Sequence, residues 1–224
     1  MSTIPKTVRK VIFELNPDLK VRKQYVEVNY QQSVIYCIDN FYKNPKKISN
    51  LFWIQPPDYH DREFGIGYNR EYFQDLRHQI DLDISHVWNY LSNLCGQEKA
   101  FDVNIQTNVI KFRNHPFNDY KNNYWWPHYD YGYTGLVYLN EDDEECGTNL
   151  YQCLDSNEDW VRANISEHSE PWRSKDKYKL LKTLKPKYNR LVLFDGKNIC
   201  HGQHVTDKYF GDDYRLNQVF FFKQ

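Results

Sequence analysis

The clearest periodicity in the chain lies in residues 83–95, where apolar side chains recur at helical spacing. The apolar residues of this face are Ile84, Val87, Trp88, Leu91 and Leu94. The pattern predicts a helix that packs its apolar face against a sheet. Asp83 is the expected N-cap, and Gly96 suits the C-terminal cap.

The segments before this helix mix strand and helix patterns. Residues 8–15 and 21–29 carry β-rich patterns on either side of a turn-like Asn-Pro-Asp sequence. The apolar run 33–39 predicts a short buried strand. The Asn-Pro pair at 44–45 predicts the start of a helix that ends near Phe52, because Asn can cap a helix and Pro is tolerated at its first position.

From Phe101 onward the period changes to that of strands, and residues 103–109 alternate between apolar and polar side chains. Loops rich in Asp, Asn, Gly and Pro separate further expected strands, at 133–139, 148–153, 178–184, 190–194, 199–205 and 214–222. The polar segment 155–177 has no clean period, and we interpret it as an insertion loop at the mouth of a pocket. A helical N-terminal third followed by many short strands predicts an α+β, mainly β fold with a sandwich or barrel as its main body.

Length and charge limit the classes of protein that fit. We expect a single domain over 1–224, with N-terminal strands and supporting helices in 1–100 and the strand-rich core in 101–224. The formal net charge of -1 argues against a nucleic-acid partner and against an acidic membrane surface. No stretch approaches the ~18 apolar residues of a membrane helix. Residues 1–10 lack the apolar run of a signal peptide, and the five cysteines form no CxxC pair, so we expect a cytoplasmic protein with free thiols.

The strongest chemical signal is the sequence Trp-Pro-His-Tyr-Asp at 126–130. Residues i and i+2 of a strand point to the same face, so His128 and Asp130 can reach one ion together. A histidine from a distant strand would complete a set of two imidazoles and one carboxylate, which leaves open positions at Fe(II) for a cosubstrate and dioxygen. His201 and His204 are the two candidates, and in a regular strand they point to opposite faces.

Further motifs follow this triplet in a fixed order. They are a strand ending in Tyr138-Leu139-Asn140, an acidic run over 141–145, a Gly-Thr strand at 147–150, the Arg-Leu-Val-Leu-Phe strand at 190–194, His201, and Arg215 in the last strand. In this combination, residues 101–222 resemble the 2-oxoglutarate and Fe(II)-dependent oxygenases, in particular their prolyl-hydroxylase-like branch. An Asp39-Asn-Phe sequence before the Asn-Pro helix also looks like the opening element of many of these proteins.

The resemblance implies a fold, an activity and a set of site residues. The fold is a double-stranded β-helix, also called a jelly-roll or cupin-like core. The activity is a dioxygenase that hydroxylates a C–H bond with Fe(II), 2-oxoglutarate and O2 and releases succinate and CO2. His128, Asp130 and His201 match the metal ligands, and His201 is favoured over His204 because it opens the strand after the Arg-Leu-Val-Leu-Phe motif. Arg215 matches the anchor for the distal carboxylate of 2-oxoglutarate, since its planar fork can hold a carboxylate with two bonds.

Tyr138 matches the phenol that hydrogen-bonds the same carboxylate in some relatives. Two positions depart from the family pattern: Phe112 stands where Tyr is common, and Asn217 stands where Ser is common. The resemblance admits a peptide, an amino acid or another small molecule as substrate, and it sets no oligomeric state.

Two other functions compete with hydroxylation. A non-catalytic cupin-like protein would bind a metal or ligand without turnover, but it would have no need of the anchor at Arg215. Relatives that halogenate lack the carboxylate ligand, so the presence of Asp130 favours hydroxylation.

Overall fold

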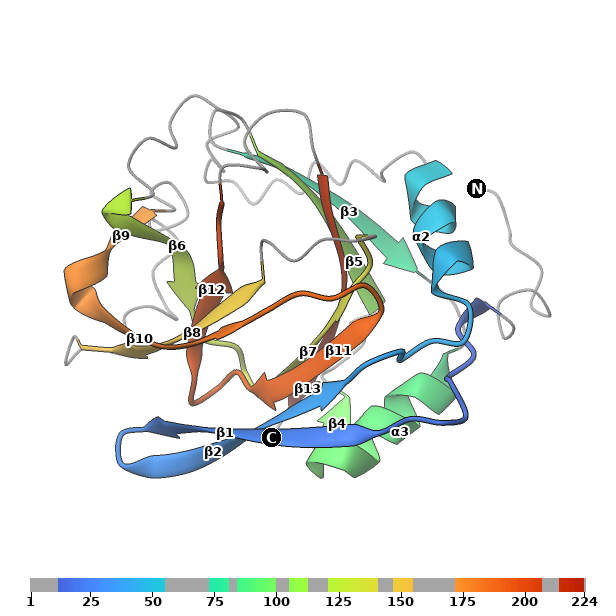
Figure 1. Cartoon of the computed structure of the whole chain (residues 1–224), viewed down its shortest axis with the longest axis horizontal. Helices are drawn as coiled ribbons and strands as arrows, with labels where there is room; N and C mark the ends of the chain where they lie inside the picture. Colours follow the sequence, from blue (N-terminus) through green and yellow to red (C-terminus); the bar gives the residue numbers. More distant parts are fainter. Residues whose placement is uncertain are drawn as a thin grey trace.

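The structure is a computed structural model, and it describes residues 12–54, 73–80, 84–99, 105–112, 121–140, 147–154, 172–206 and 214–223. Within these ranges the chain forms mainly β-structure, in two curled antiparallel sheets with two α-helices (Figure 1). None of the helices in these ranges has the length and apolar character needed to cross a membrane.

The larger sheet has eight strands, in the order β1, β2, β11, β7, β13, β5 and β3, with β4 paired to β13. Their bounds are β1 (Val21–Val28), β2 (Gln31–Ile38), β11 (Arg190–Asp195), β7 (Tyr133–Tyr138), β13 (Tyr214–Lys223), β5 (Ile105–Phe112), β3 (Phe73–Ile80) and β4 (Glu98–Lys99). The smaller sheet has the order β10 (Tyr178–Leu184), β8 (Thr148–Cys153), β12 (Cys200–Gln203), β6 (Asn123–His128) and β9 (Trp172–Ser174). From β5 to β8, and again from β10 to β13, successive strands alternate between the two sheets.

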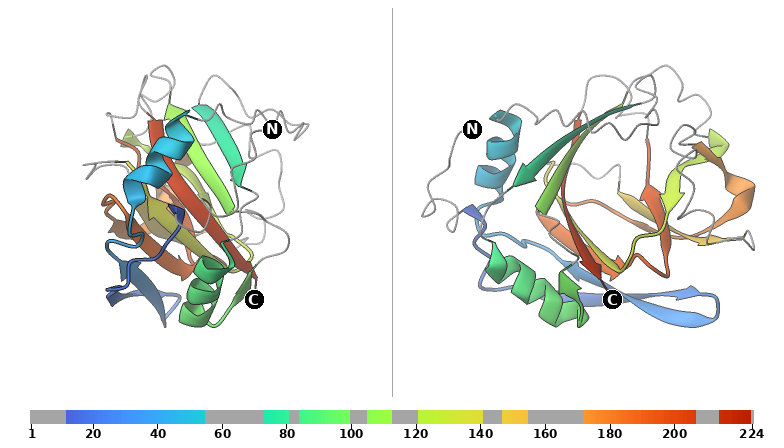
Figure 2. Two further views of the ribbon diagram at one scale, coloured as in Figure 1. Left: turned by 90° about the vertical axis from the view of Figure 1, so that its right-hand side faces the viewer. Right: turned by 180° about the vertical axis from the view of Figure 1, so that it is seen from behind.

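The central strands of the larger sheet are buried on both faces, and along β11 four consecutive apolar residues are buried. Tyr138, Val192 and Phe194 point to one face, where they pack with Leu150 and Leu184 of the smaller sheet. Their sequence neighbours point to the other face and pack against α2 (Pro45–Ile54) and α3 (Ser85–Cys95). Figure 2 shows the two helices on the outside of the larger sheet. The two faces of this sheet therefore separate a supporting core from an interior shared with the smaller sheet.

The sequence predicted most of these elements. The helix expected at 83–95 is α3, and Gly96 ends it in the left-handed region with φ 70°, its N–H donating to the carbonyl of Ser92. The helix expected from 44–45 is α2. The expected strands from 33–39 and from 133 onward correspond to β2, β7, β8, β10, β11, β12 and β13. Two facing sheets with α3 outside one of them were also expected.

Other expectations are wrong. The N-cap of α3 is Ile84, without a side-chain cap, in place of the expected Asp83. The described part of the strand expected at 8–15 contains only an isolated bridge from Leu15 to Tyr42, because Phe13 is buried against the Tyr42 ring and the segment serves packing more than pairing. The N-terminal third is not mainly helical, since β1 and β2 lie in it and β3 begins at its end.

The insertion loop expected at 155–177 ends earlier than predicted. Trp172–Ser174 forms β9, which pairs with the edge of β6, and Lys175–Lys177 is a 3-10 turn. Edge pairing with β6 satisfies backbone groups and overrides the polar, aperiodic sequence. Residues 155–171 and the acidic run 141–145 lie outside the described residues, so the position expected for the loop at a pocket mouth stays a prediction.

Candidate metal centre

Three potential metal ligands converge in the interior between the two sheets. His128 is the last residue of β6, Asp130 follows in the turn to β7, and His201 lies in β12 directly opposite His128. One ligand atom from each residue lies within 4.8 Å of the other two. His201 Nε2 is 3.3 Å from Asp130 Oδ2, and His128 Nε2 is 4.0 Å from Asp130 Oδ1. His204, the other sequence candidate, is not part of this group and follows the end of β12.

A bulge in β6 brings His128 to the inner face. Gln203 pairs with Trp125 and His201 pairs with His128. Between these two pairs β6 therefore contains one more residue than β12. Trp126 takes a positive φ of 40° at this point. In an unbroken register His128 would pair with Cys200, which packs on the outer face of the smaller sheet. The extra residue therefore re-aims the histidine toward the interior, as bulges beside functional sites commonly do.

Hydrogen bonds set the tautomer of both histidines. His128 Nδ1 lies 2.9 Å from the carbonyl oxygen of Trp126, and His201 Nδ1 lies 3.2 Å from that of Ile199. A carbonyl oxygen can only accept, so each Nδ1 carries a hydrogen and donates it. The Nε2 lone pairs are left to face Asp130. This arrangement, with one ring nitrogen tied to the backbone and the other free, is the usual support of a metal-binding histidine.

Asp130 is held from two sides. Its N–H donates to the carbonyl of Gly196 at 2.8 Å, and its Oδ2 accepts a hydrogen bond from the Thr134 hydroxyl. Burial raises the pKa of this carboxyl, but His201 and His128, when each carries a second proton on Nε2, and the Thr134 hydroxyl outweigh burial and lower the pKa to about 2. Asp130 is therefore an anion at neutral pH, with its charge directed at the two imidazoles.

Arg215 and Tyr138 lie on the inner face of the larger sheet. Both are buried, and the Arg215 guanidinium carbon is 5.7 Å from the centroid of the Tyr138 ring. Burial raises the pKa of the Tyr138 hydroxyl, which stays a neutral phenol and shares a 2.8 Å hydrogen bond with Thr148 of β8. The ring of Phe194, on β11, packs edge-on to His201 at 4.9 Å between centroids.

Asn217 lies directly opposite Tyr138, two residues after Arg215 on β13. The side chain is buried, and its Oδ1 has no hydrogen-bond partner among the described residues. A buried polar oxygen of this kind is rare in a folded protein and indicates a place for a ligand or a water.

Sequence reasoning missed the supports of the site. Thr134 and Gly196 hold Asp130, and neither was singled out. Pro127 was the available signal for the bulge, because proline cannot donate to a ladder and within sheets occurs at edges and bulges. The hydroxyl at Thr134 has no comparable signature, since its role depends on the turn that brings it back to Asp130.

Comparison with known proteins gives distant structural likenesses only. No protein-family model and no curated protein matches the chain. A Pseudomonas putida prolyl-4-hydroxylase is similar at 13% identity, over 70% of this chain and 76% of that one, with a TM-score of 0.35. An N-substituted L-amino acid dioxygenase from Burkholderia ambifaria AMMD is similar at 11% identity, over 89% of this chain and 93% of that one, with a TM-score of 0.40. One of these neighbours is a prolyl-4-hydroxylase and the other a dioxygenase, which are the kinds of protein that the motifs resemble.

Proposed function

We propose that the chain is a 2-oxoglutarate and Fe(II)-dependent dioxygenase whose ligands are His128, Asp130 and His201. The observation that carries the proposal is the convergence of two imidazole Nε2 atoms and one carboxylate within 4.8 Å. The proposal takes residues 1–224 as one domain with a jelly-roll core in 101–224. The alternation of successive strands between the two sheets supports that core.

The donor set fits iron. Two neutral imidazoles and one carboxylate are the ligands of non-haem Fe(II) oxygenases, and they leave coordination positions open. A structural zinc site would be expected to close its coordination with a fourth protein ligand. The described residues contribute three such groups here, which favours an open, catalytic site.

Residues on the inner face of the larger sheet support the proposed cosubstrate site. Arg215 is a cation buried in the interior, and a buried cation favours an anionic ligand. Its guanidinium would hold the distal carboxylate of 2-oxoglutarate, with the Tyr138 phenol beside it. The Asn217 side chain lies on the same face and would contact the same ligand or an ordered water.

When bound, iron with 2-oxoglutarate and O2 supplies the oxidising chemistry, which hydroxylates a C–H bond and releases succinate and CO2. The chain positions and orients these groups. The backbone carbonyls of Trp126 and Ile199 hold both imidazoles in the Nδ1–H tautomer, and Thr134 orients the carboxylate. Phe194 packs an apolar ring beside His201 and keeps water from that side of the site. We propose a peptide, an amino acid or another small molecule as the substrate.

A binding protein without turnover is the second candidate. The same three ligands could hold a metal in a cupin-like protein, but such a protein would have no need of a buried arginine as an anchor for 2-oxoglutarate. The carboxylate of Asp130 also favours hydroxylation over halogenation, because relatives that halogenate lack this carboxylate.

Anaerobic titration tests the proposal. Fe(II) followed by 2-oxoglutarate should produce a weak visible charge-transfer band, and no band should form with succinate in place of 2-oxoglutarate. On admission of O2, succinate release should depend on both iron and 2-oxoglutarate. Binding of iron without the band would exclude the dioxygenase, and binding of both without succinate release under any substrate screened would favour the binding protein.

A further inference from the structure

Strand β1 forms a long and regular edge of the larger sheet. It pairs with β2 through eight consecutive residues without a register shift, and no strand formed by the described residues lies beside its other edge in the sheet order. Figure 1 shows the β1–β2 hairpin along one border of the molecule. β10 lies at the neighbouring edge of the smaller sheet, where a register shift between Leu180 and Lys182 interrupts it. Such shifts protect edges from pairing, and β1 lacks this protection.

Exposed apolar side chains gather along this edge. Among the described residues six large hydrophobic side chains are exposed, and four of them line one open cavity of about 680 Å³ between β1 and β10. The four are Tyr25 at 53% exposure, Tyr30 at 96%, Leu154 at 56% and Leu180 at 43%. A gathering of apolar groups beside an unpaired edge indicates an interaction surface.

The hairpin turn determines which backbone groups of β1 are open. Asn29 and Tyr30 both have positive φ, at 49° and 62°, and form a two-residue turn between Val28 and Gln31. Such a turn closes with a hydrogen-bonded pair, so the N–H and C=O of Val28 point at β2. The direction alternates along the strand. Lys23, Tyr25 and Glu27 therefore present their N–H and C=O groups at the open edge.

We propose that a second copy of this chain pairs with β1, antiparallel and about a two-fold axis that passes beside Tyr25. Tyr25 then faces Tyr25 of the partner subunit, and Lys23 faces Glu27 of the partner subunit on both sides of the axis. The three facing pairs all have open backbone groups and exchange about six hydrogen bonds. Their side chains lie on the same face, where an aromatic pair and two opposite-charge pairs stabilise an antiparallel ladder.

Charge selects this occupant and this register. In the part of the chain that the structure describes, Lys23 and Glu27 have no ion-pair partner, and Lys23 lies over the Tyr36 ring on the exposed face. In an antiparallel ladder, two residues that lie opposite each other both direct their N–H and C=O groups at the partner strand, or both direct them away from it. A two-fold axis between two β1 strands must therefore pass beside a residue and not between two residues. An axis beside Lys23 would oppose two lysines. Axes beside Gln24 or Val26 would leave both charges opposite uncharged side chains.

The test uses the full chain and its mass in solution over a concentration series. Wild type should be a dimer. Glu27→Lys places two lysines opposite each other in each outer pair, and Lys23→Glu places two glutamates together, so each variant should weaken the dimer by about tenfold or more. Mixing the two variants should restore a dimer, because every facing pair is then of opposite charge. Restoration would also show that both variants are folded.

Asp176→Lys is the matched control, since it makes the same charge change at an exposed residue of the 3-10 turn and should leave the dimer unchanged. A wild type that is monomeric over the whole series would overturn the proposal. A dimer that resists both single substitutions, or one that mixing does not restore, would also overturn it. Binding of an unrelated extended peptide by a monomeric wild type would assign the edge to another partner.

Discussion

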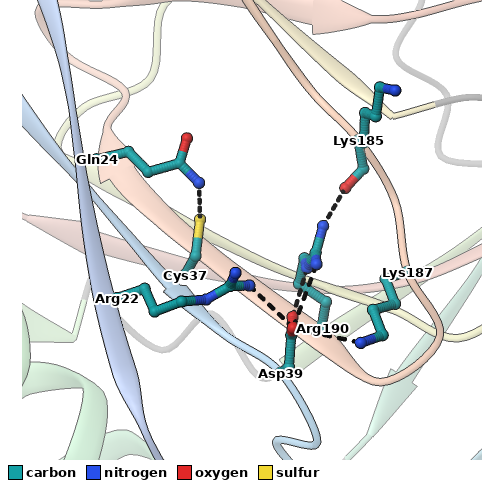
Figure 3. Close-up of polar contacts among 7 residues, drawn as sticks. All are labelled: Arg22, Gln24, Cys37, Asp39, Lys185, Lys187 and Arg190. Carbon is teal, nitrogen blue, oxygen red and sulfur yellow. Dashed lines mark hydrogen bonds and ion pairs between the residues drawn. The ribbon is translucent and has the colours of Figure 1, made fainter.

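Two aspartates in this chain lie among basic side chains, and their surroundings are opposite in kind. Asp39 lies near the end of β2 among permanent cations, with Arg190 Nε at 2.6 Å, Arg22 Nη2 at 2.9 Å and Lys187 Nζ at 3.4 Å (Figure 3). Asp130 lies among imidazoles whose ring N–H groups are directed at backbone carbonyls. The first carboxylate is surrounded by donors. The second faces lone pairs.

The difference separates a structural ion cluster from a ligand site. At Asp39 both carboxylate oxygens accept hydrogen bonds from guanidinium groups, so the negative charge is already balanced by neighbouring cations and does not favour a metal ion. At Asp130 two imidazole nitrogens and a carboxylate present electron pairs to the same small volume, which is unfavourable until a proton or a metal ion lies between them. A count of nearby basic residues would make Asp39 the stronger candidate for a ligand site. The direction of the hydrogen bonds identifies Asp130 as the ligand site instead.

Removal of a converging imidazole should have the largest effect. His201→Ala should weaken Fe(II) binding more than about a hundredfold, since even the loss of a supporting partner costs roughly 10–100-fold. His204→Ala is the matched control and should keep most of the affinity, because His204 is outside the converging group. Bound iron after anaerobic titration measures both variants. The reverse pattern would make His204 the ligand, and equal retention would show that neither histidine binds the metal.

Replacement of the buried arginine should affect the cosubstrate but not the metal. Arg215→Leu should reduce the affinity for 2-oxoglutarate at least tenfold, from the loss of a buried charge-assisted pair on the order of 2–5 kcal/mol. Fe(II) affinity should persist. Arg190→Leu is the control, because the Arg190 guanidinium is already bonded to Asp39. Calorimetric titration of 2-oxoglutarate into the iron-loaded proteins separates the two arginines, and an unchanged affinity in Arg215→Leu would exclude it as the anchor.

The difference between the Asp130 site and the Asp39 cluster can also be tested without replacing a metal ligand. A Cβ at Gly196 would lie 2.5 Å from Thr134 Oγ1 and 3.1 Å from Asp130 Cβ, so Gly196→Ala should displace the carboxylate. We expect about 1–3 kcal/mol of destabilisation and a roughly tenfold loss of Fe(II) affinity. Gly96→Ala should destabilise the fold through its positive φ while leaving Fe(II) affinity intact. If both variants bind iron as wild type does, Gly196 has no part in holding Asp130.

The sequence predicted a helix or strand correctly where one pattern of apolar residues runs through the whole segment. The apolar face of α3 is buried on one side of the helix, and the continuous apolar run of β11 is buried on both faces of the sheet, so local pattern and tertiary packing agree. Segment 12–15 was mistaken for a strand because its apolar residues fill the outer core of the larger sheet without pairing. Trp172–Ser174 was mistaken for loop because pairing with β6 is decided by a distant partner.

Some features of the candidate metal site could be predicted from the sequence, and others depend on tertiary structure. His128 and Asp130 are close in sequence, so their joint use could be predicted, and the family order of motifs favoured His201. The bulge at Trp126 could not be read from alternation, because one extra residue reverses the face of every residue after it. The i and i+2 argument assumed a regular strand through Asp130, whereas β6 ends at His128. The two side chains converge through the turn that Gly196 and Thr134 hold.

The smallest expected effect concerns Asp39, and it should appear in stability alone. Burial raises the pKa of Asp39, but the hydrogen bond and charge of Arg190, together with Arg22 and Lys187, outweigh burial and lower it from the ordinary value of 3.8. A carboxyl whose pKa is lower in the folded chain stabilises the fold only while it is ionised. Asp39→Asn should therefore cost about 1–2 kcal/mol of unfolding free energy at neutral pH, a modest figure because the cluster is partly exposed.

This cost should shrink as the pH falls below the ordinary aspartate pKa and vanish below the lowered one, because wild type then loses its charge as well. Denaturant unfolding at pH 7 and at steps down to about pH 3 measures the difference between the two proteins. Asp176→Asn, at an exposed residue, should change stability by less than about 0.5 kcal/mol throughout. Iron affinity at neutral pH should be the same in Asp39→Asn and wild type, since the Asp39 carboxylate pairs with Arg22, Lys187 and Arg190 and not with the metal ligands. A difference in stability that stays constant with pH would show that the Asp39 cluster acts through packing and not through charge.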